Sequence, residues 1–281
     1  MALETLPEHL RVGTHLLPLD RTLVMGVLNV TPDSFSDGGQ HFLAARAIER
    51  AQRMAAEGAD IIDVGGESTR PGGAHPVSAD EELSRVLPVI EAIAGKLPVP
   101  ISIDSVKPAV AKRCLDAGAV MVNDVYGLRE PEMVEIAAAA RAAVVIMHMK
   151  GTPQTMASEA VYDDLIEEVR QYLVERAALA DAAGIETVII DPGIGFAKNG
   201  AHNLTVLNNL PCFADLGYPL LVGPSRKRFI GELTGAPAND RLGGTIAAVT
   251  ACVMGGANIV RVHDVAACKQ AVIVADAIRR A

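Results

Sequence analysis

The sequence predicts an α/β protein of a single domain, a (β/α)8 TIM barrel preceded by a short N-terminal extension. Eight short apolar segments recur along the 281 residues, each followed by polar residues and separated from the next by a helical stretch. No linker or change in composition divides the chain. A doubly wound open sheet would use the same alternation, but eight nearly even repeats favour a closed barrel.

The predicted strands are short runs rich in Val and Ile. Hydrophobic residues make up 50% of the chain and aromatic residues only 3%, so aliphatic side chains must fill the core, as they do around parallel strands buried on both faces. We predict strands at residues 23–29, 59–66, 100–105, 120–124, 143–148, 187–193, 219–225 and 258–264. Gly58, Gly118, Gly184 and Gly217 stand where the intervening helices should end.

This assignment divides the chain into a barrel and an N-terminal extension. Residues 23–281 form the predicted barrel. Residues 1–22 are interpreted as an N-terminal extension that could form a hairpin over the bottom of the barrel.

Charge and cysteine content exclude several classes of partner. The formal net charge is −9 and the pI is about 5.3, which argues against a nucleic-acid partner. The four cysteines are scattered without a CxxC motif, as expected in a reducing compartment and not for structural zinc. Neither a signal peptide nor a membrane span is predicted, because the N-terminus has no apolar region and the uncharged stretch 242–260 is interrupted by Gly and Asn. We therefore expect a cytoplasmic protein with no membrane partner.

Polar residues follow every predicted strand. In a (β/α)8 barrel these strand ends meet at one face, where active sites lie. A single Asp, Asn or Ser at such a position could equally cap the next helix, but Lys227, Arg261 and His263 are poor caps. The polar strand ends are Asn29, Asp63, Asp104, Asn123, Asp124, His148, Asp191, Ser225, Arg226, Lys227, Arg261, His263 and Asp264.

These side chains predict the kind of ligand. Asp104, Asn123 and Asp191 can pair with the N–H groups of a flat heterocycle. Lys227 and Arg261 suit a phosphate or a carbonyl oxygen. The sequence thus indicates a ligand with a polar ring and an anionic tail. Two Gly-rich segments, VTPDSFSDGGQ after the first strand and GGESTRPGG after the second, are predicted to be lids over it, with plain surface loops as the alternative.

Eight runs of sequence resemble dihydropteroate synthase, in order and at barrel spacing from about Leu23 to Val265. They are MGVLNVTPDSFSDGG, GADIIDVGGESTRPGG, ISIDS, VNDVYGL, MHMKGTPQTM, IIDPGIGFAK, LLVGPSRKRFIG and GANIVRVHDV. The resemblance implies a transferase of folate biosynthesis that joins 6-hydroxymethyl-7,8-dihydropterin pyrophosphate to para-aminobenzoate and releases pyrophosphate. It also implies a homodimer, a Mg²⁺ cofactor and sensitivity to sulfonamides.

The resemblance also assigns roles to residues. It implies that the pterin is held by Asp104, Asn123, Asp191 and Lys227. It implies that Arg261 and His263 hold the pyrophosphate, and we expect free pterin to bind nearly as well without Arg261. Asn29 would contact Mg²⁺ and phosphate; Asn29, Lys227, Arg261 and His263 are the expected catalytic residues. Thr69, Arg70, Asp33 and Phe35 would line the substrate mouth from the two loops.

The chain departs from the family at Arg228, where many members have a Ser associated with the para-aminobenzoate carboxylate. We expect the backbone to hold that carboxylate and the Arg228 guanidinium to lean towards solvent, because a cation opposes the dipole at a helix start. Two other functions use similar residues: a methyltetrahydrofolate methyltransferase with a corrinoid partner, and a non-catalytic pterin-binding paralogue. The RVHD motif and the NVTPDSFSDGG loop favour the synthase over both.

Overall fold

The computed structural model describes residues 6–31, 40–68 and 76–281. Eight parallel strands form one sheet in the order β8-β7-β6-β5-β4-β3-β10-β9, and pairing of Ile190 with Leu220 joins its two edges. The predicted (β/α)8 barrel is therefore confirmed. The strands are β3 (Leu23–Asn29), β4 (Ile61–Gly65), β5 (Ile101–Asp104), β6 (Met121–Asp124), β7 (Ala143–Met147), β8 (Val188–Asp191), β9 (Leu221–Val222) and β10 (Ile259–Val262).

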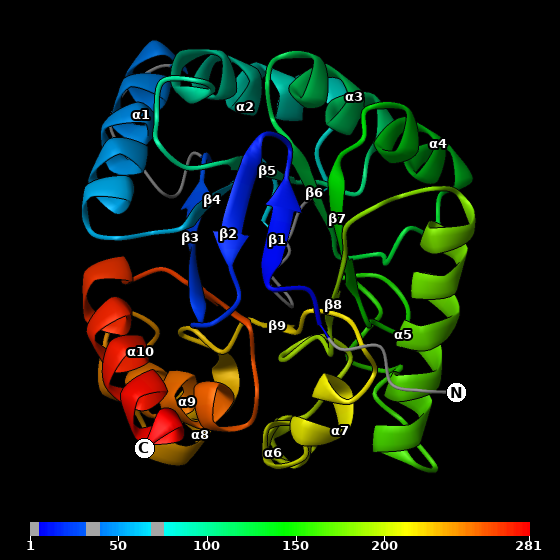
Figure 1. Cartoon of the computed structure of the whole chain (residues 1–281), viewed down its shortest axis with the longest axis vertical. Helices are drawn as coiled ribbons and strands as arrows, with labels where there is room; N and C mark the ends of the chain where they lie inside the picture. Colours follow the sequence, from blue (N-terminus) through cyan, green and yellow to red (C-terminus); the bar gives the residue numbers. More distant parts are fainter. Residues whose placement is uncertain (1–5, 32–39, 69–75) are drawn as a thin grey trace.

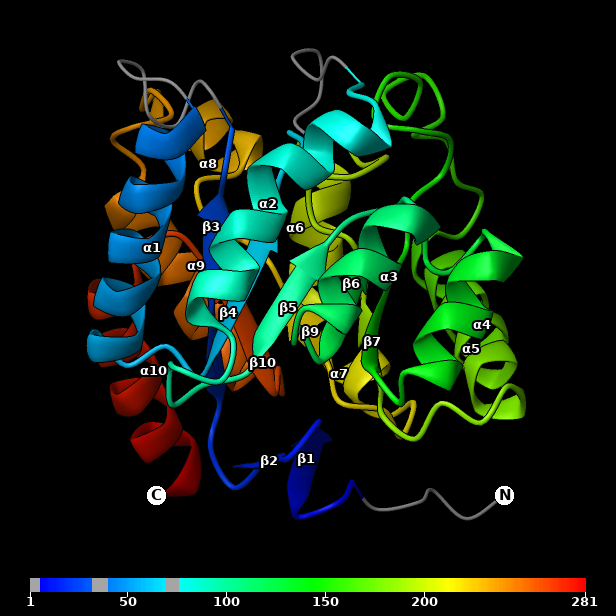
Figure 2. The same cartoon turned by 90° about the horizontal axis from the view of Figure 1, so that it is seen from above.

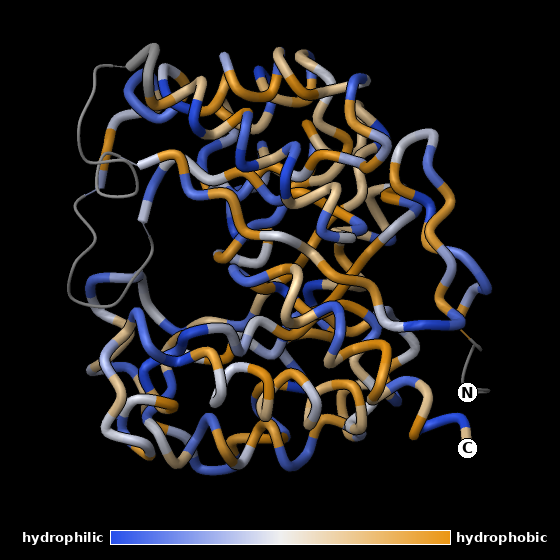
Figure 3. Tube along the Cα trace, turned by 90° about the vertical axis from the view of Figure 1, so that its left-hand side faces the viewer, coloured by the Kyte–Doolittle hydropathy of each residue, from blue (hydrophilic) through white to orange (hydrophobic). Residues whose placement is uncertain are grey.

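Helices surround the strands (Figures 1 and 2). They are α1 (Gln40–Ala56), α2 (Ala79–Ile93), α3 (Pro108–Asp116), α4 (Pro131–Ala139), α5 (Leu165–Ala182), α6 (Gly200–Asn208), α7 (Pro211–Ala214), α8 (Arg228–Thr234), α9 (Leu242–Met254) and α10 (Val265–Arg280). The four glycines predicted to end helices, Gly58, Gly118, Gly184 and Gly217, all have positive φ. Along the peripheral helices, hydrophobic and hydrophilic residues alternate (Figure 3), as expected when only one face is buried. In the described part of the chain no helix is long and apolar enough to cross a membrane.

The strands divide the core into two layers. Successive side chains of a strand point to opposite faces, so Val24 and Ile62 pack outward under the helices while Leu23 and Ile61 point into the barrel. The outer layer is the larger one and runs beneath the ring of helices. The inner layer lies at the N-terminal ends of the strands, and this leaves the C-terminal ends available for polar side chains.

An antiparallel hairpin lies against the bottom of the barrel, at the N-terminal ends of its strands (Figure 2). It consists of β1 (His9–Val12) and β2 (His15–Pro18). Buried Leu10 and Val12 pack against the inner layer of the barrel. The hairpin turn requires Gly13, which has φ +58° and where a Cβ would lie 2.7 Å from Val120 Cγ1.

Candidate active site

The pleat of the strands brings the predicted site residues to the inside of the barrel. Ile61, Met121, Ile189 and Ile259 belong to the inner layer. Two positions further along each of these strands, the side chain faces inward again. Those positions hold Asp63, Asn123, Asp191 and Arg261, and the same rule turns Asn29 and Asp104 inward on β3 and β5. On each of these strands the inward-facing side chains are therefore apolar at the N-terminal end and polar at the C-terminal end.

Arg261 lies at the centre of this polar layer. Its Nε donates to Asp63 Oδ2 at 2.6 Å and its Nη2 donates to Asp104 Oδ2 at 2.5 Å. Asn123 Nδ2 donates to the same Asp63 oxygen at 2.9 Å. Asp104 and Asn123 are also direct neighbours in the register of β5 and β6. The structure thus links Asp104 and Asn123, two of the four predicted pterin residues, through Arg261 and Asp63, and Asp63 is 0% exposed.

This arrangement differs from the prediction that Arg261 binds the pyrophosphate while other residues bind the pterin ring. Here the Arg261 guanidinium is bonded to the side of the site that carries Asp104. In the sequence, Asp63 was recognised only as one of the polar strand ends. Its inward position between Ile62 and Val64 was the available signal for a role inside the barrel.

Burial and charge perturb the carboxylates of this layer. Burial raises the pKa of Asp104 to about 7, and the charge of Arg261 opposes that rise. Burial also raises the pKa of Asp191, against a backbone hydrogen bond from Gly193 and the charge of Lys227. That hydrogen bond runs from the Gly193 N–H to Asp191 Oδ1 at 2.7 Å and orients the carboxylate. Titratable groups with such shifts in a polar strand-end cluster are typical of a functional site.

The loop after β8 packs against the loop after β7. Gly193 has φ +73°, and a Cβ there would overlap the carbonyl oxygen of His148. Further along this loop the ring of Phe196 lies beneath Lys227, whose Nζ is 4.1 Å from the ring centroid. The predicted pterin residues Asp191 and Lys227 are therefore held by one short segment, since the stem of Lys227 also lies against Gly195.

Lys198 is a buried amine that sequence reasoning missed. Its Nζ lies 2.9 Å from His148 Nδ1 and donates to the Phe196 carbonyl at 3.2 Å. Burial lowers the pKa of Lys198 to about 7. Burial and the charge of Lys198 lower the pKa of His148 to about 2, so the imidazole is neutral and accepts at Nδ1. The last residue of the GIGFAK run was the available signal for Lys198, but nothing in the sequence pairs it with His148.

Asn29 and His263 lie at two further strand ends, and Arg228 lies at the start of a helix. His263 follows β10, and its Nδ1 lies 3.0 Å from Ser225 Oγ in the loop after β9. Asn29 ends β3 and is the register neighbour of Gly65, which in turn neighbours Asp104. Arg228 begins α8; its side chain is 83% exposed and pairs with Glu232 at 2.8 Å. The expected outward direction of its guanidinium is thus observed.

Four predicted residues, Asp33, Phe35, Thr69 and Arg70, lie outside the described residues. Glu67, just before the second of these segments, forms an ion pair with Lys107 in the next βα loop. Lys107 also pairs with Glu82 of α2 at 2.5 Å. A cavity of about 20 Å³, room for one water molecule, lies between this group and Asp104.

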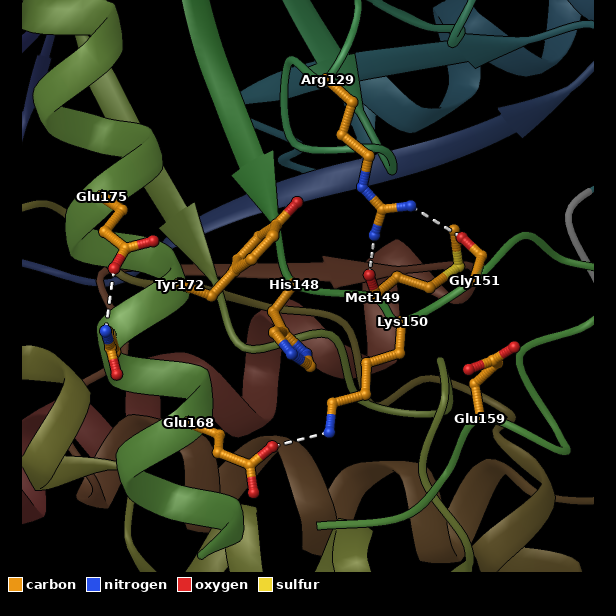
Figure 4. A pocket seen from close by; sticks show the side chains of 10 residues that line it. Arg129, His148, Met149, Lys150, Gly151, Glu159, Glu168, Tyr172 and Glu175 are labelled. Atoms are coloured by element: carbon orange, nitrogen blue, oxygen red, sulfur yellow. Dashed lines mark hydrogen bonds and ion pairs between the residues drawn. The ribbon is translucent and has the colours of Figure 1, made fainter. Parts of the chain in front are cut away.

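A larger cavity of about 570 Å³ lies to the side of the polar layer, between the loop after β7 and α5 (Figure 4). His148 stands between it and the buried Lys198. The two cationic residues that line this cavity have partners within the protein. Lys150 pairs with Glu168 at 2.6 Å, and Arg129 donates to the carbonyls of Met149 and Gly151. None of the predicted pterin residues lines it.

Carboxylates, an amide and cations gather at the C-terminal end of the barrel, the face at which enzymes of the (β/α)8 class have their active sites. In agreement, residues 25–263 match the family model described as pterin binding enzyme. The chain belongs to the dihydropteroate synthase family.

Named relatives support this assignment over nearly the whole chain. A dihydropteroate synthase of Synechocystis sp. is 50% identical over 279 residues, covering 98% of this chain and 96% of the relative. Two solved structures are similar in fold. The dihydropteroate synthase of Yersinia pestis in a sulfonamide drug complex has a TM-score of 0.91 at 44% identity and covers 97% of this chain and 100% of its own. That of Xanthomonas albilineans with 4-aminobenzoic acid has a TM-score of 0.91 at 46% identity and covers 98% of this chain and 99% of its own.

Proposed function

We propose that this protein is a dihydropteroate synthase, which condenses 6-hydroxymethyl-7,8-dihydropterin pyrophosphate with para-aminobenzoate to give 7,8-dihydropteroate and pyrophosphate. The observation that carries the proposal is the inward-facing layer of Asp104, Asn123 and Arg261 joined through Asp63. A carboxylate and an amide side by side can pair with the amino and ring N–H groups of a pterin. Membership of the family supports the same substrate.

The reaction requires substrate binding and charge stabilisation more than it requires a strong base. The amine of para-aminobenzoate is a neutral nucleophile at pH 7, and the bond that breaks joins a methylene group to pyrophosphate. Lys227, Arg261 and His263 would stabilise negative charge as pyrophosphate leaves. Asp104, Asn123 and Asp191 would fix the ring so that the methylene faces the amine. Thr69, Arg70, Asp33 and Phe35 would complete the substrate mouth.

Asn29 is the proposed Mg²⁺ contact. Mg²⁺ binds oxygen ligands and usually keeps substrate phosphates and water as part of its shell. The Asn29 carboxamide supplies such an oxygen at an inward-facing strand end. Within residues 6–31, 40–68 and 76–281, no group of three or more His, Cys, Asp or Glu side chains could hold a metal ion. Asn29 would thus be one ligand of an ion that takes its remaining ligands from the diphosphate and from water. When bound, it would neutralise charge on the departing pyrophosphate.

We further propose a cytoplasmic homodimer. Ile273, Val274 and Ile278 of α10 are 58%, 58% and 59% exposed, and α9 beside it exposes Leu242 and Met254. Such apolar helix faces are typical of subunit contacts. All four cysteines are unpaired, as expected in a reducing compartment. Sedimentation of the wild type and of Ile273→Glu would test the dimer.

The decisive assay measures pyrophosphate release from the pterin pyrophosphate with and without para-aminobenzoate. A synthase releases pyrophosphate and forms dihydropteroate when both substrates are present. A non-catalytic paralogue would bind the pterin and release nothing, and a methyltransferase would ignore the pyrophosphate ester. We also expect a sulfonamide to compete with para-aminobenzoate. Product formation that is absent with both substrates and Mg²⁺ would refute the assignment.

A further inference from the structure

Two adjacent cross-links join the loops that follow β9 and β10. Ser225 Oγ lies 3.0 Å from His263 Nδ1. The next residue in each loop continues the connection, because Arg226 donates from Nε and Nη2 to the two oxygens of Asp264 at 2.9 and 2.6 Å. Bidentate pairs of this kind fix geometry as well as distance. The position of Ser225 relative to His263 is therefore determined by two neighbouring links.

Both loops are also anchored from behind. The Arg226 N–H donates to Thr245 Oγ1 at 3.0 Å, and Thr245 is fully buried in α9. The Arg241 guanidinium donates to the Arg226 carbonyl at 3.1 Å. On the other side, Arg50 of α1 donates to the His263 carbonyl at 2.9 Å. The backbone on both sides of the Ser225–His263 contact is thus held in place before any ligand binds.

The Ser225 hydroxyl can define which nitrogen of His263 carries a proton. Its oxygen accepts a hydrogen bond from the His263 backbone N–H at 3.2 Å. A hydroxyl has one proton of its own to donate, and here Nδ1 is within reach. When Nδ1 accepts, the neutral imidazole carries its proton on Nε2. When the ring is protonated, Nδ1–H donates to the hydroxyl oxygen and Nε2–H remains. In both states Nε2 is a donor.

We propose that Ser225 is a positioning residue that keeps His263 Nε2 a hydrogen-bond donor towards the pyrophosphate leaving group. The inference rests on the proposed function, which assigns His263 to the pyrophosphate. A phosphate oxygen accepts hydrogen bonds only, so the opposite tautomer would present a lone pair to it and repel it. Orienting partners of metal-bound histidines contribute about 10- to 100-fold, and we expect an effect of the same size for His263. The loss should appear in turnover, because the leaving group gains negative charge during the reaction.

Ser225→Ala tests this role directly. In the wild type, ¹⁵N NMR of the imidazole should show His263 in the Nε2–H form, and in Ser225→Ala a mixture of tautomers. Turnover should fall about 10- to 100-fold, with free-pterin affinity unchanged. Thr245→Val is the matched control, because it keeps the side-chain volume and removes the neighbouring hydroxyl that holds Arg226. Should Thr245→Val produce the same mixture of tautomers, general loosening of the loop would be the cause and the proposal would fail.

A double-mutant cycle separates action through His263 from action elsewhere. Once His263→Ala has removed the imidazole, adding Ser225→Ala should cost less than about twofold more in turnover. Independent losses that multiply would overturn the proposal, as would a single Nε2–H tautomer in Ser225→Ala. The NMR measurement needs no turnover. If the wild type forms no dihydropteroate, the proposed function fails while the tautomer result still tests Ser225.

Discussion

The carboxyl group of Asp104 is subject to two opposing influences, burial and the adjacent Arg261. Burial prevails and raises its pKa from 3.8 to about 7. Ionising Asp104 in the folded protein therefore costs free energy, so its favourable contribution to stability is present below pH 4 and is lost as the pH rises through about 7. Ligand binding has the opposite dependence, since an ionised carboxylate is the better acceptor for ring N–H groups.

We therefore expect free-pterin affinity to rise about tenfold between pH 6 and pH 8, as the ionised fraction of Asp104 goes from about one tenth to about nine tenths. Isothermal titration calorimetry across this range would measure it. Asp104→Asn should bind more weakly and lose this dependence. A wild-type affinity that is flat from pH 6 to pH 8 would contradict the role given to Asp104.

Arg261 compensates two buried carboxylates, and its removal should affect more than pyrophosphate. Arg261→Ala leaves Asp63 and Asp104 without their cation, and breaking a buried ion pair costs about 3–5 kcal/mol. We expect lower unfolding free energy at pH 8, a smaller loss at pH 5 where Asp104 is protonated, and weaker free-pterin binding. Urea unfolding at both pH values and pterin calorimetry would test this. Unchanged free-pterin binding would contradict this and would support the prediction from the sequence that Arg261 acts on the pyrophosphate alone.

We expect the departure from the family at Arg228 to have little effect on catalysis. Its guanidinium is exposed and pairs with Glu232, so it lies away from the inward-facing layer. Arg228→Ser should change the Michaelis constant for para-aminobenzoate by only a few-fold, and surface pairs of this type contribute about 0–1 kcal/mol to stability. Steady-state kinetics at saturating pterin pyrophosphate would measure the constant. A rise above about 100-fold would mean that the guanidinium itself binds the carboxylate.

At the scale of elements, the strands were predictable because their apolar runs are short, β-branched and evenly spaced. Their ends were less predictable, and proline explains the largest difference. The run predicted as 219–225 forms only the two-residue β9, since Pro219 and Pro224 have no N–H to donate to a neighbouring strand. Pro192 likewise stops β8 at Asp191.

The inward direction of the site residues also follows from the alternation of side chains along a strand, once the inward-facing residues at the N-terminal end of that strand are known to be apolar. What the sequence could not supply are contacts between loops. Lys198 with His148 and Arg226 with Asp264 are separated by 50 and 38 residues, and no local pattern relates them. The placement of Asp63 between Arg261 and Asn123 likewise depends on three strands meeting inside a closed barrel.

The loop after β8 gives a test at this scale. Gly193→Ala would place a methyl group on the His148 carbonyl, in a backbone conformation with positive φ. We expect a loss of more than about 3 kcal/mol in unfolding free energy, from strain and clash together. Gly184→Ala is the matched control, because Gly184 has φ +80° but no atom within 4 Å of the added Cβ. It should cost about 1–2 kcal/mol. Similar losses for both variants would show that the contact with His148 is not the cause.

For the whole molecule, the hairpin completes the hydrophobic interior from below. Leu10 is 2% exposed against the inner layer, whereas Leu16 in the same hairpin is 55% exposed. Leu10→Ala should lower the unfolding free energy by about 2–5 kcal/mol, and Leu16→Ala by less than about 0.5 kcal/mol. Pterin affinity should be unchanged in both, because the substrate end lies at the opposite side of the barrel. Denaturant unfolding and calorimetry would test both; equal destabilisation would mean that the hairpin does not seal the interior.

The segment between hairpin and barrel imposes an order on biosynthesis. Thr22 binds Asp276 through both its N–H and its hydroxyl, across 254 residues, and β3 pairs with β10 near the other end of the chain. While the ribosome is still making the last helix, the hairpin and first barrel strand cannot have all of their final partners. The hairpin and the β10-facing edge of β3 must therefore wait, with their apolar surface partly uncovered, until almost the whole chain has been translated. Contacts of such long range slow folding, and the interval is when a chaperone would be needed most.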